Sequence, residues 1–251
     1  MKLAAWQAPL LPHGSMAAIA LARERIAWCE AEGIRTLLCP EALLGGLADD
    51  AEHPTESAIS VENGELETLL TPLASDTVTT IIGFTEITSG GKLHNSAAIL
   101  HRGALLGVYR KRHPAIRRSV YSPGEEMPVF TVDGLTFGIM ICNDTNYPEL
   151  ARTLVARGAQ ALFVPSNNAL SPEKADVVNA THAVDIACAR ENRVPVIRAD
   201  VAGRSADRVA FGTSIIVGAG GDMLALASPL AEDMLVTTIP SEIELADYCR
   251  R

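Results

Sequence analysis

The side chain best suited to nucleophilic chemistry in this sequence is the thiol of Cys142. It follows the apolar run 135–141 and precedes the polar residues 143–146. The apolar run predicts a buried strand, and Pro148 with Glu149 is typical of the first turn of a helix. A thiol in a strand-to-helix turn lies beside free backbone N–H groups, which favour a thiolate or a developing oxyanion.

The other four of the five cysteines have patterns typical of structural residues. Cys29 and Cys188 continue apolar stripes on predicted helices. Cys39 lies within an apolar strand pattern, and Cys249 lies near the C-terminus. The odd number and wide spacing argue against a disulfide framework and a cysteine metal site. We expect neither a metal nor a cofactor, because the sequence also lacks a phosphate-binding glycine loop before a helix.

Two charged residues follow other predicted strands in the same way. Glu41 comes after the strand pattern 36–39, and Lys111 comes after the pattern 105–109. Ligands bind beyond the strand ends of open α/β sheets, so residues distant in sequence can meet there. A carboxylate, an ammonium group and a thiol would then converge. Taken singly, each charged residue has an ordinary alternative as a solvated surface side chain.

Together these segments resemble, in order and spacing, the three motifs of the nitrilase superfamily of carbon–nitrogen hydrolases. The resemblance extends over nearly the whole chain. The matching segments are Leu3-Ala4-Ala5-Trp6-Gln7, Pro40-Glu41, His94-Asn95-Ser96-Ala97, Tyr109-Arg110-Lys111-Arg112-His113, Tyr121-Ser122-Pro123-Gly124, Ile141-Cys142-Asn143-Asp144, Tyr147-Pro148-Glu149, Ala189-Arg190-Glu191-Asn192 and Gly212-Thr213-Ser214-Ile215-Ile216-Val217. The segment after the cysteine is similar to that of the carbamoylase branch.

The resemblance implies a catalytic triad of Glu41, Lys111 and Cys142. Glu41 would act as the base toward the Cys142 thiol, because a free thiol with a pKa of about 8.5 is largely protonated at neutral pH. Lys111 and the backbone N–H of Asn143 would stabilise the oxyanion. The acyl group would pass through a thioester that water hydrolyses, with release of ammonia or an amine.

The resemblance also implies an α/β fold, a four-layer α-β-β-α sandwich formed by residues 1–251 as a single carbon–nitrogen hydrolase domain. By analogy, outer helices would join copies into a homodimer or a higher even-numbered homo-oligomer. Apolar helix stripes could equally face the sheets of their own chain.

Five residues are candidates for oxyanion or substrate binding: Asn143, Tyr147, Asn167, Asn168 and His113. Asn167 and Asn168 follow a predicted strand, but asparagines are also common turn formers. Tyr147 could instead fix the start of a helix, and His113 could be a structural group.

Ser119 departs from the resemblance. Many relatives carry a second glutamate at this position, where it helps orient the lysine and the attacking water. Glu125 and Glu126 follow the next turn but are typical of a solvated loop, so we do not assign them to the site.

The residues after Asp144 bear on the substrate. Carbamoylases bind a substrate carboxylate with arginines at the positions held here by Thr145 and Asn146. Their absence predicts a neutral amide or carbamoyl substrate. Arginines elsewhere in the chain could replace them. The candidates are Arg117, Arg118, Arg193 and Arg198.

We therefore expect a hydrolase of nonpeptide carbon–nitrogen bonds in a small amide or N-carbamoyl substrate, with amidase chemistry favoured over nitrile hydrolysis. Two alternatives remain. An acyltransferase would pass the same thioester to an amine, and a catalytically idle binding scaffold would account for Ser119.

Composition is typical of a globular enzyme, with 48% hydrophobic and 20% charged residues. The net charge of -9 disfavours nucleic acid as a partner. No apolar stretch is long enough to span a bilayer, and the chain begins with the strand-like segment 3–6 rather than a signal peptide. We expect a cytoplasmic protein with no membrane partner.

Strand and helix patterns alternate along the chain. Ser15 is a plausible helix N-cap, and Gly33 a plausible stop. The predicted strands are 3–6, 36–39, 79–84, 93–100, 105–109, 135–141, 161–164, 194–199, 213–217 and 223–227, the predicted helices are 15–32, 64–74, 148–157 and 176–192, and turns are predicted at 90–91, 133–134 and 220–222.

Overall fold

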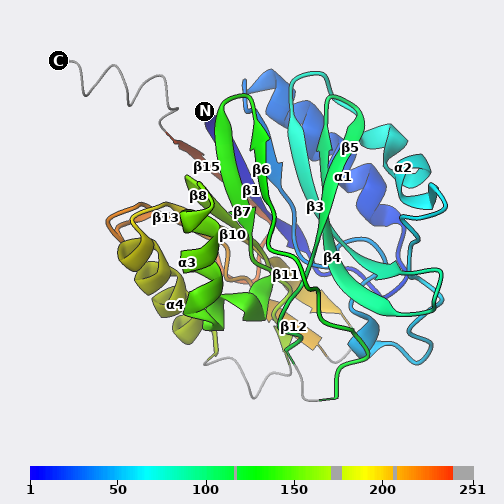
Figure 1. Cartoon of the computed structure of the whole chain (residues 1–251). Coiled ribbons are helices and arrows are strands. Elements are labelled where there is room, and N and C mark those ends of the chain that lie inside the picture. The colour runs from blue at the N-terminus through cyan, green and yellow to red at the C-terminus, as the bar shows by residue number, and fades with distance from the viewer. Residues whose placement is uncertain (116–117, 171–176, 206–207, 240–251) are drawn as a thin grey trace.

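Two β-sheets pack face to face between helices in the computed structural model, which describes residues 1–115, 118–170, 177–205 and 208–239. Helices α1 (Ala17–Ala31) and α2 (Glu65–Leu70) lie at the right of Figure 1, and α3 (Pro148–Ala156) and α4 (Val177–Asn192) lie at the lower left, with strands between them. The layers are therefore helix, sheet, sheet and helix, which confirms the expected four-layer sandwich.

The sheet beside α1 and α2 has nine strands in the described part of the chain. They are β1 (Lys2–Pro9), β2 (Thr36–Leu38), β3 (Thr79–Ile87), β4 (Leu93–His101), β5 (Ala104–Arg110), β9 (Ala169–Leu170), β11 (Val201–Ser205), β12 (Arg208–Phe211) and β15 (Asp233–Thr238). Their order is β5-β4-β3-β2-β1-β11-β12-β9, and β15 pairs antiparallel with β1.

The sheet beside α3 and α4 has six strands among the described residues. They are β6 (Val129–Val132), β7 (Leu135–Ile139), β8 (Ala161–Pro165), β10 (Val196–Ala199), β13 (Ile215–Val217) and β14 (Met223–Leu226). Their order is β14-β13-β10-β8-β7-β6, and the central strands β7, β8 and β10 run parallel.

Large apolar side chains from both sheets meet between the two layers. Leu38 and Ile81 of one sheet share a buried cluster with Phe137 and Phe163 of the other. The two phenylalanine rings pack edge to face with centroids 5.0 Å apart. Each fully buried side chain of this size contributes about 1.5–3 kcal/mol to folding, so this cluster fixes the sheets against each other.

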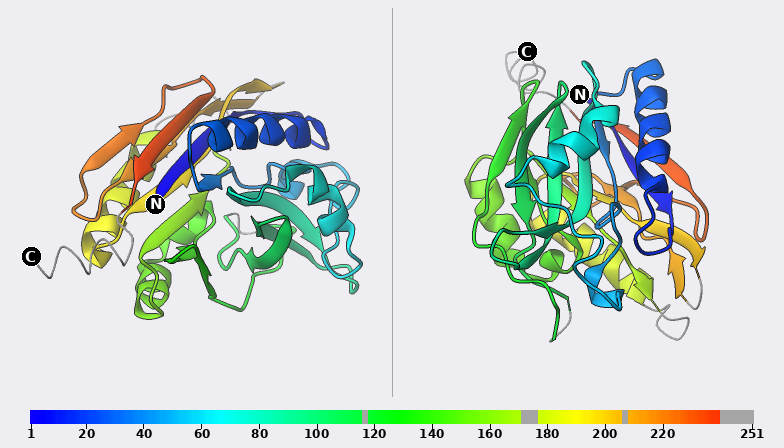
Figure 2. Two further views of the ribbon diagram at one scale, coloured as in Figure 1. Left: turned by 90° about the horizontal axis from the view of Figure 1, so that it is seen from above. Right: turned by 90° about the vertical axis from the view of Figure 1, so that its right-hand side faces the viewer.

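The apolar stripes of the helices face the sheets of their own chain. Ala22 and Ile26 of α1 share a buried cluster with Trp6 of β1, and Leu154 of α3 shares another with Leu162 of β8. The left view of Figure 2 shows α1 (blue) and α3 (green) on opposite outer sides of the strands. These stripes are used within the fold, and the expected oligomer stays a prediction.

The strands that precede the candidate catalytic residues point toward one edge of the sandwich. Strands β2 and β3 are parallel, and β5 runs parallel to β3 because each is antiparallel to β4. A backbone hydrogen bond from Glu41, after β2, to the carbonyl of Ser166, after β8, joins the two sheets at this edge. The carboxyl ends of β2, β5, β7 and β8 therefore meet there, as expected for an α/β site.

Most predicted elements are confirmed, with shifted ends. Helix α1 begins at Ala17, so its N-cap is Met16 rather than the predicted Ser15, although the Ser15 Oγ accepts a hydrogen bond from the Ala17 N–H at 3.3 Å. Gly33 has a φ of +66°, as a helix stop requires. The predicted helix 64–74 is α2 followed by a 3₁₀ turn, Thr71–Leu73. Residue 176, the predicted start of α4, lies outside the described residues.

Five strands were not predicted from the sequence: β6, β9, β11, β12 and β15. Strand β11 contains Gly203 and Arg204, and β15 begins at Asp233. Polar and small residues such as these weaken the strand pattern, and pairing with distant partners decides their conformation instead.

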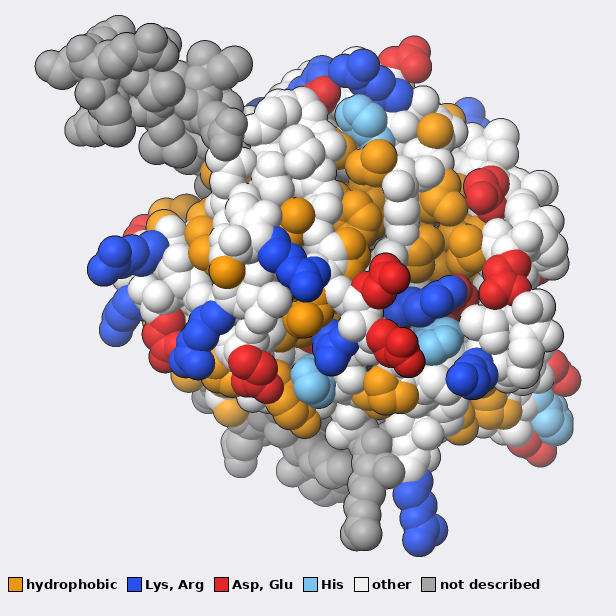
Figure 3. Space-filling view, in the orientation of Figure 1, with side chains coloured by type: hydrophobic (Ala, Val, Ile, Leu, Met, Phe, Trp, Pro, Cys, Tyr) orange, Lys and Arg blue, Asp and Glu red, His pale blue; other side chains and the backbone are white. Residues whose placement is uncertain are grey.

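The surface shown in Figure 3 carries acidic and basic side chains interspersed with one another, rather than gathered by sign. Mixed charges of this kind are typical of a solvated surface. Among the described residues, no helix combines the length and the apolar character that crossing a bilayer requires.

Gly83 on β3 permits the close approach of the segment that carries Glu41. A Cβ at this glycine would lie 2.4 Å from the Pro40 carbonyl oxygen and 2.7 Å from the Glu41 Cα. Both contacts are with backbone, which cannot move away without displacing the carboxylate.

We therefore expect Gly83→Ala to lower the free energy of unfolding by about 1–3 kcal/mol, measured by urea denaturation. The matched control is Gly90→Ala, because a Cβ there meets its nearest neighbour at 3.8 Å. The control should change stability by no more than about 0.5 kcal/mol. Equal effects of the two substitutions would contradict the packing argument.

Candidate active site

A buried ion pair between Glu41 and Lys111 forms the centre of the site. The Lys111 Nζ donates to the Glu41 Oε1 at 2.6 Å, and the two residues are 3% and 2% exposed. Asn95 on β4 donates its Nδ2 to the same oxygen at 2.7 Å. The backbone N–H of Asn167 donates to the Glu41 Oε2 at 2.9 Å. Three elements thus hold the carboxylate in one orientation.

The charges in this pair stabilise each other. Burial alone disfavours a charged lysine and is the largest single influence on Lys111. The attraction of the Glu41 carboxylate, with further contributions from Cys142 and Asp144, outweighs burial and holds the pKa of Lys111 above its ordinary value. Lys111 therefore stays positive at neutral pH.

Cys142 lies at the first position of a 3₁₀ turn, Cys142–Asn146, directly after the buried segment that continues β7. Its φ is +46°, a left-handed conformation that is uncommon for a residue with a Cβ. Burial, reinforced by the negative charge of Glu41, raises the pKa of its thiol to about 12, against the opposing influence of Lys111 and Arg198. This raised pKa favours the neutral thiol over the thiolate at neutral pH.

Asp144 connects the cysteine turn to the segment that carries the lysine. Its carboxylate accepts hydrogen bonds from the Tyr109 hydroxyl at 2.8 Å, from the Ile141 N–H at 2.9 Å and from the His113 N–H at 2.8 Å. Tyr109 and His113 flank Lys111, and Ile141 precedes Cys142. One fully buried carboxylate thus fixes the lysine and the thiol relative to each other.

A cavity of about 280 Å³ opens beside the thiol. Its lining includes Cys142, Asn143, Thr145, Asn168 and Arg198. This volume accommodates a small ligand, and among the described residues that line it Arg198 carries the one charge.

Arg198, on β10, is 1% exposed and already has a carboxylate partner. Its Nε and Nη2 donate to the two oxygens of Asp185 on α4 at 2.5 and 2.6 Å. Its Nη2 also donates to the Thr145 hydroxyl at 3.2 Å, and its Nη1 donates to the Ser166 hydroxyl. The charge that this arginine presents to the cavity is thus compensated within the protein.

The five candidate binding residues are not equivalent in the structure. Asn143 and Asn168 line the cavity beside the thiol. Asn167 instead binds Glu41, through its backbone N–H and through an Nδ2 contact with the Glu41 carbonyl at 3.3 Å. The Tyr147 and His113 rings stack on each other with centroids 3.6 Å apart, and neither residue is among those that line the cavity.

Ser119 is held by a carboxylate from another part of the chain. The Ser119 hydroxyl donates to Asp49 Oδ2 at 2.8 Å, and the Val120 N–H donates to Asp49 Oδ1 at 2.7 Å. Asp49 belongs to a 3₁₀ turn, Ala48–Asp50. The serine therefore fixes a loop to this turn. Arg117, one of the arginines considered above, lies outside the described residues, and Arg118 is exposed.

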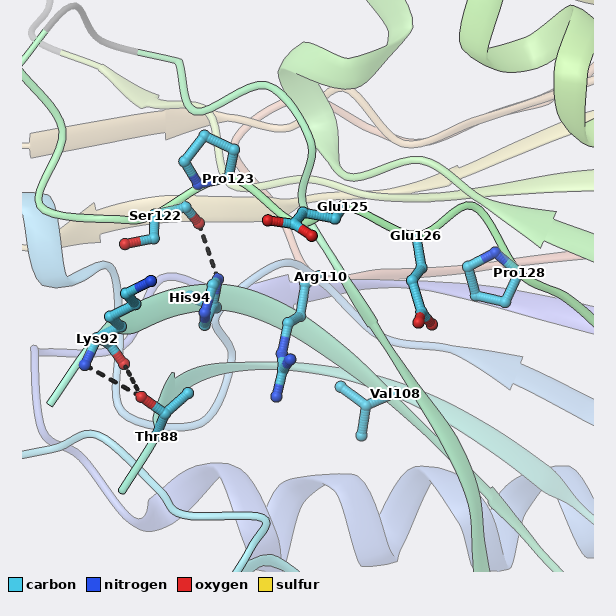
Figure 4. A pocket seen from close by; sticks show the side chains of 11 residues that line it. Thr88, Lys92, His94, Val108, Arg110, Ser122, Pro123, Glu125, Glu126 and Pro128 are labelled. Atoms are coloured by element: carbon cyan, nitrogen blue, oxygen red, sulfur yellow. Dashed lines mark hydrogen bonds between the residues drawn. The ribbon is translucent and has the colours of Figure 1, made fainter. Parts of the chain in front are cut away.

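A second cavity, of about 520 Å³, is lined by the other side of β5 (Figure 4). Arg110, Glu125 and Glu126 are among its lining residues, and Figure 4 shows the hydrogen bond between His94 and the Ser122 carbonyl, which measures 2.9 Å. Side chains alternate along a strand, so Lys111 and Arg110 point to different sides. Glu125 and Glu126 thus lie away from the cavity beside Cys142.

Sequence reasoning missed several residues that the structure places around Glu41, Lys111 and Cys142. Asn95, Asp144, Asp185 and Asp200 are all buried and polar, and each binds a group at this edge. Asn95 and Asp144 lie within segments that the family resemblance singles out, and their place in those segments was the available signal. Asp185 gave no such signal. Its place on helix α4 does not indicate that its partner is Arg198 on β10.

Comparison with known proteins places the chain in a family. The family model described as carbon–nitrogen hydrolase matches residues 3–248. A nitrilase from Pyrococcus abyssi is 31% identical over 83% of this chain and 78% of its own length. An (R)-stereoselective amidase from Pseudomonas sp. is 30% identical over 74% of this chain, which spans 64% of that amidase.

A solved structure of similar fold is that of an amidase mutant from Nesterenkonia sp. AN1, described as showing the result of Michael addition of acrylamide at its active site cysteine. It has a TM-score of 0.79 and 23% identity, and the match covers 100% of this chain and 98% of that one. Because the family model matches almost the entire length of the chain, the chain belongs to the carbon–nitrogen hydrolase family.

Proposed function

We propose that this protein hydrolyses a small neutral amide or carbamoyl compound through a thioester on Cys142. The observation that carries the proposal is the buried Glu41–Lys111 ion pair, whose charges both act on the Cys142 thiol. Burying two charges is expensive for a fold, and a catalytically idle scaffold has no need of them beside a cysteine.

The first step is nucleophilic addition. Glu41 takes the proton from the Cys142 sulfur as the sulfur attacks the carbonyl carbon of the substrate, and the carbonyl electron pair moves to oxygen. A thiol with a raised pKa is unreactive on its own but becomes a strong nucleophile when a base removes its proton in the transition state. The buried site beside Glu41 therefore keeps the resting thiol protonated, and the same Glu41 activates it when substrate is attacked.

The oxyanion needs donors that are already in place. Lys111 is positive and held by Glu41, and the backbone N–H of Asn143 follows the nucleophile in a tight turn. Each such donor contributes about 3–4 kcal/mol to transition-state stabilisation. The adduct then collapses: the carbon–nitrogen bond breaks, its electron pair stays on nitrogen, and the proton on Glu41 passes to the leaving group.

The second half of the reaction repeats these roles with water. Glu41 removes a proton from water as its oxygen attacks the thioester carbon, and the sulfur leaves and regains a proton. The products are an acid and ammonia or an amine. The relatives named as amidase and nitrilase support this class of chemistry, and so does the amidase whose cysteine carries the acrylamide adduct.

The charge of the cavity favours a neutral substrate. Asp185 compensates Arg198 with two hydrogen bonds, and Thr145 and Asn146 supply no charge. A substrate carboxylate entering here would lose its hydration without gaining a free cation.

The proposed triad predicts that substrate forms a covalent adduct on Cys142 and that substitution of any of the three residues lowers activity. A mixture of small amides and carbamoyl compounds should produce an acyl mass increase on the Cys142 peptide, and ammonia, in the wild type but not in Cys142→Ala. Glu41→Gln and Lys111→Met should each lower kcat/KM by about 100-fold or more while circular dichroism shows a folded protein.

The matched control is Glu126→Gln, because that exposed carboxylate lines the other cavity and should leave the rate unchanged. Adding hydroxylamine separates hydrolysis from acyl transfer by trapping the acyl group as a hydroxamate. An adduct on another cysteine, or full activity in Glu41→Gln, would overturn the proposed mechanism.

The raised pKa of Cys142 predicts how its thiol titrates. Because the pKa is raised from 9.0 to about 12, the thiol should stay protonated up to about pH 10, where an ordinary cysteine is already ionised. The measurement is the ultraviolet absorbance of the thiolate, taken as the difference between wild type and Cys142→Ser across the pH range. A transition at or below about pH 8.5 would show a preformed thiolate instead.

The compensated arginine predicts a preference among substrates of equal length. Butyramide should have a kcat/KM about tenfold or more above that of succinamic acid, which carries a carboxylate at the far end. Asp185→Asn leaves the Arg198 charge uncompensated and should narrow or reverse this preference, provided that thermal melting shows a folded variant. A wild-type preference for the acid would contradict the assignment.

A further inference from the structure

The side-chain amide of Asn168 lies between the thiol and a buried carboxylate. Its Oδ1 lies 3.5 Å from the Cys142 Sγ, as the acceptor of the thiol proton. Its Nδ2 donates to Asp200 Oδ2 at 3.0 Å and to the Thr213 hydroxyl oxygen at 3.0 Å. The oxygen end of the amide thus faces the nucleophile, and the nitrogen end faces away from it.

Asp200 determines which way this amide points. It is fully buried, and its Oδ1 accepts hydrogen bonds from the backbone N–H groups of Asn168 and Val201 at 2.9 and 2.8 Å. Its Oδ2 accepts from the Thr213 N–H at 3.0 Å and from the Thr213 hydroxyl. Since that hydroxyl proton is given to Asp200, the Thr213 oxygen can only accept from Asn168.

Rotating the Asn168 amide by half a turn would break this network. Its oxygen would then face the Asp200 carboxylate, two acceptors in contact with no proton between them, in a buried site. The carboxylate therefore selects one of two amide orientations that differ little in shape. The selected orientation presents a lone pair, not an N–H, to the cavity.

We infer that Asp200 is a positioning residue that holds Asn168 as a hydrogen-bond acceptor for the N–H of the scissile amide, so that the site selects amides over esters. This inference rests on the proposed function. In the resting enzyme the acceptor is occupied by the thiol proton. Once Glu41 has taken that proton, the oxygen is free to accept from the substrate.

The adduct formed by an amide has the right chemistry for this acceptor. Its nitrogen carries at least one hydrogen, which can donate to the Asn168 Oδ1 while the nitrogen lone pair receives the proton from Glu41. Holding the nitrogen in this way favours cleavage of the carbon–nitrogen bond over expulsion of the sulfur. The leaving oxygen of an ester has no hydrogen, so its lone pairs would face the lone pairs of Asn168.

The test compares an amide with the methyl ester of the same acid. In Asp200→Asn an amide nitrogen replaces one of the carboxylate oxygens, which removes acceptors and leaves Asn168 free to turn. We expect kcat/KM for the amide to fall by about tenfold or more, the effect of one lost hydrogen bond of ordinary strength, and kcat/KM for the ester to change little. The quantity measured is the ratio of the amide value to the ester value.

Asn168→Ala provides an independent measurement, because it removes the acceptor without disturbing the charge of Asp200. The same fall in the amide-to-ester ratio is expected, and this variant decides the question if Asp200→Asn does not fold. The control is Asp133→Asn, whose carboxylate binds Arg35 and Arg102 at the surface. It should leave the ratio unchanged.

The outcomes separate this inference from the proposed function. If the wild type forms no acyl adduct on Cys142, the proposed function fails and the inference fails with it. If acylation occurs but the folded variants lose amide and ester activity equally, or lose neither, Asp200 and Asn168 have only a structural role and the proposed function stands.

Discussion

The structure depends on keeping a carboxylate and an ammonium group charged while both are almost completely buried. Desolvation of Glu41 and Lys111 would cost several kcal/mol per ion without partners, so each must be surrounded by groups that compensate its charge. Asn95 and the Asn167 backbone supply the additional hydrogen bonds to the carboxylate. These partners come from both sheets, so the pair is stable only when the two sheets are packed. The buried pair of Glu41 and Lys111 therefore forms together with the packing of the two sheets.

Buried polar residues connect this ion pair to the segment that carries Cys142. Asp144 joins the segment of Lys111 to the turn of Cys142, and Asp200 accepts a hydrogen bond from the side-chain amide of Asn168, whose oxygen faces the thiol. Each carboxylate is buried and accepts several hydrogen bonds from backbone N–H groups, which do not vary with side-chain rotamer. Backbone N–H groups near the strand ends thus contribute to fixing the surroundings of the sulfur.

The sequence predicted the layers, most strands and helices, and the convergence of Glu41, Lys111 and Cys142, because apolar periodicity and strand-end motifs are local signals. The residues that hold them were less accessible. Asp185 and Arg198 form an ion pair across a helix and a strand, and neither residue's spacing reveals the other. The rings of Tyr147 and His113, two of the candidate binding residues, stack on each other, and their role in binding stays a prediction. Which polar residue faces a cavity depends on strand register and on side-chain orientation, and a single sequence encodes neither directly.

At Cys142, the left-handed backbone conformation makes the residue that is best for the stability of the fold different from the residue that the proposed reaction requires. A residue with a Cβ is strained at a φ of +46°, and glycine would adopt this conformation with less strain. Selection for a more heat-resistant fold would therefore favour loss of the side chain on which the proposed chemistry rests. Stabilising changes that preserve turnover must be sought elsewhere, in the outer helices or the hairpin turns.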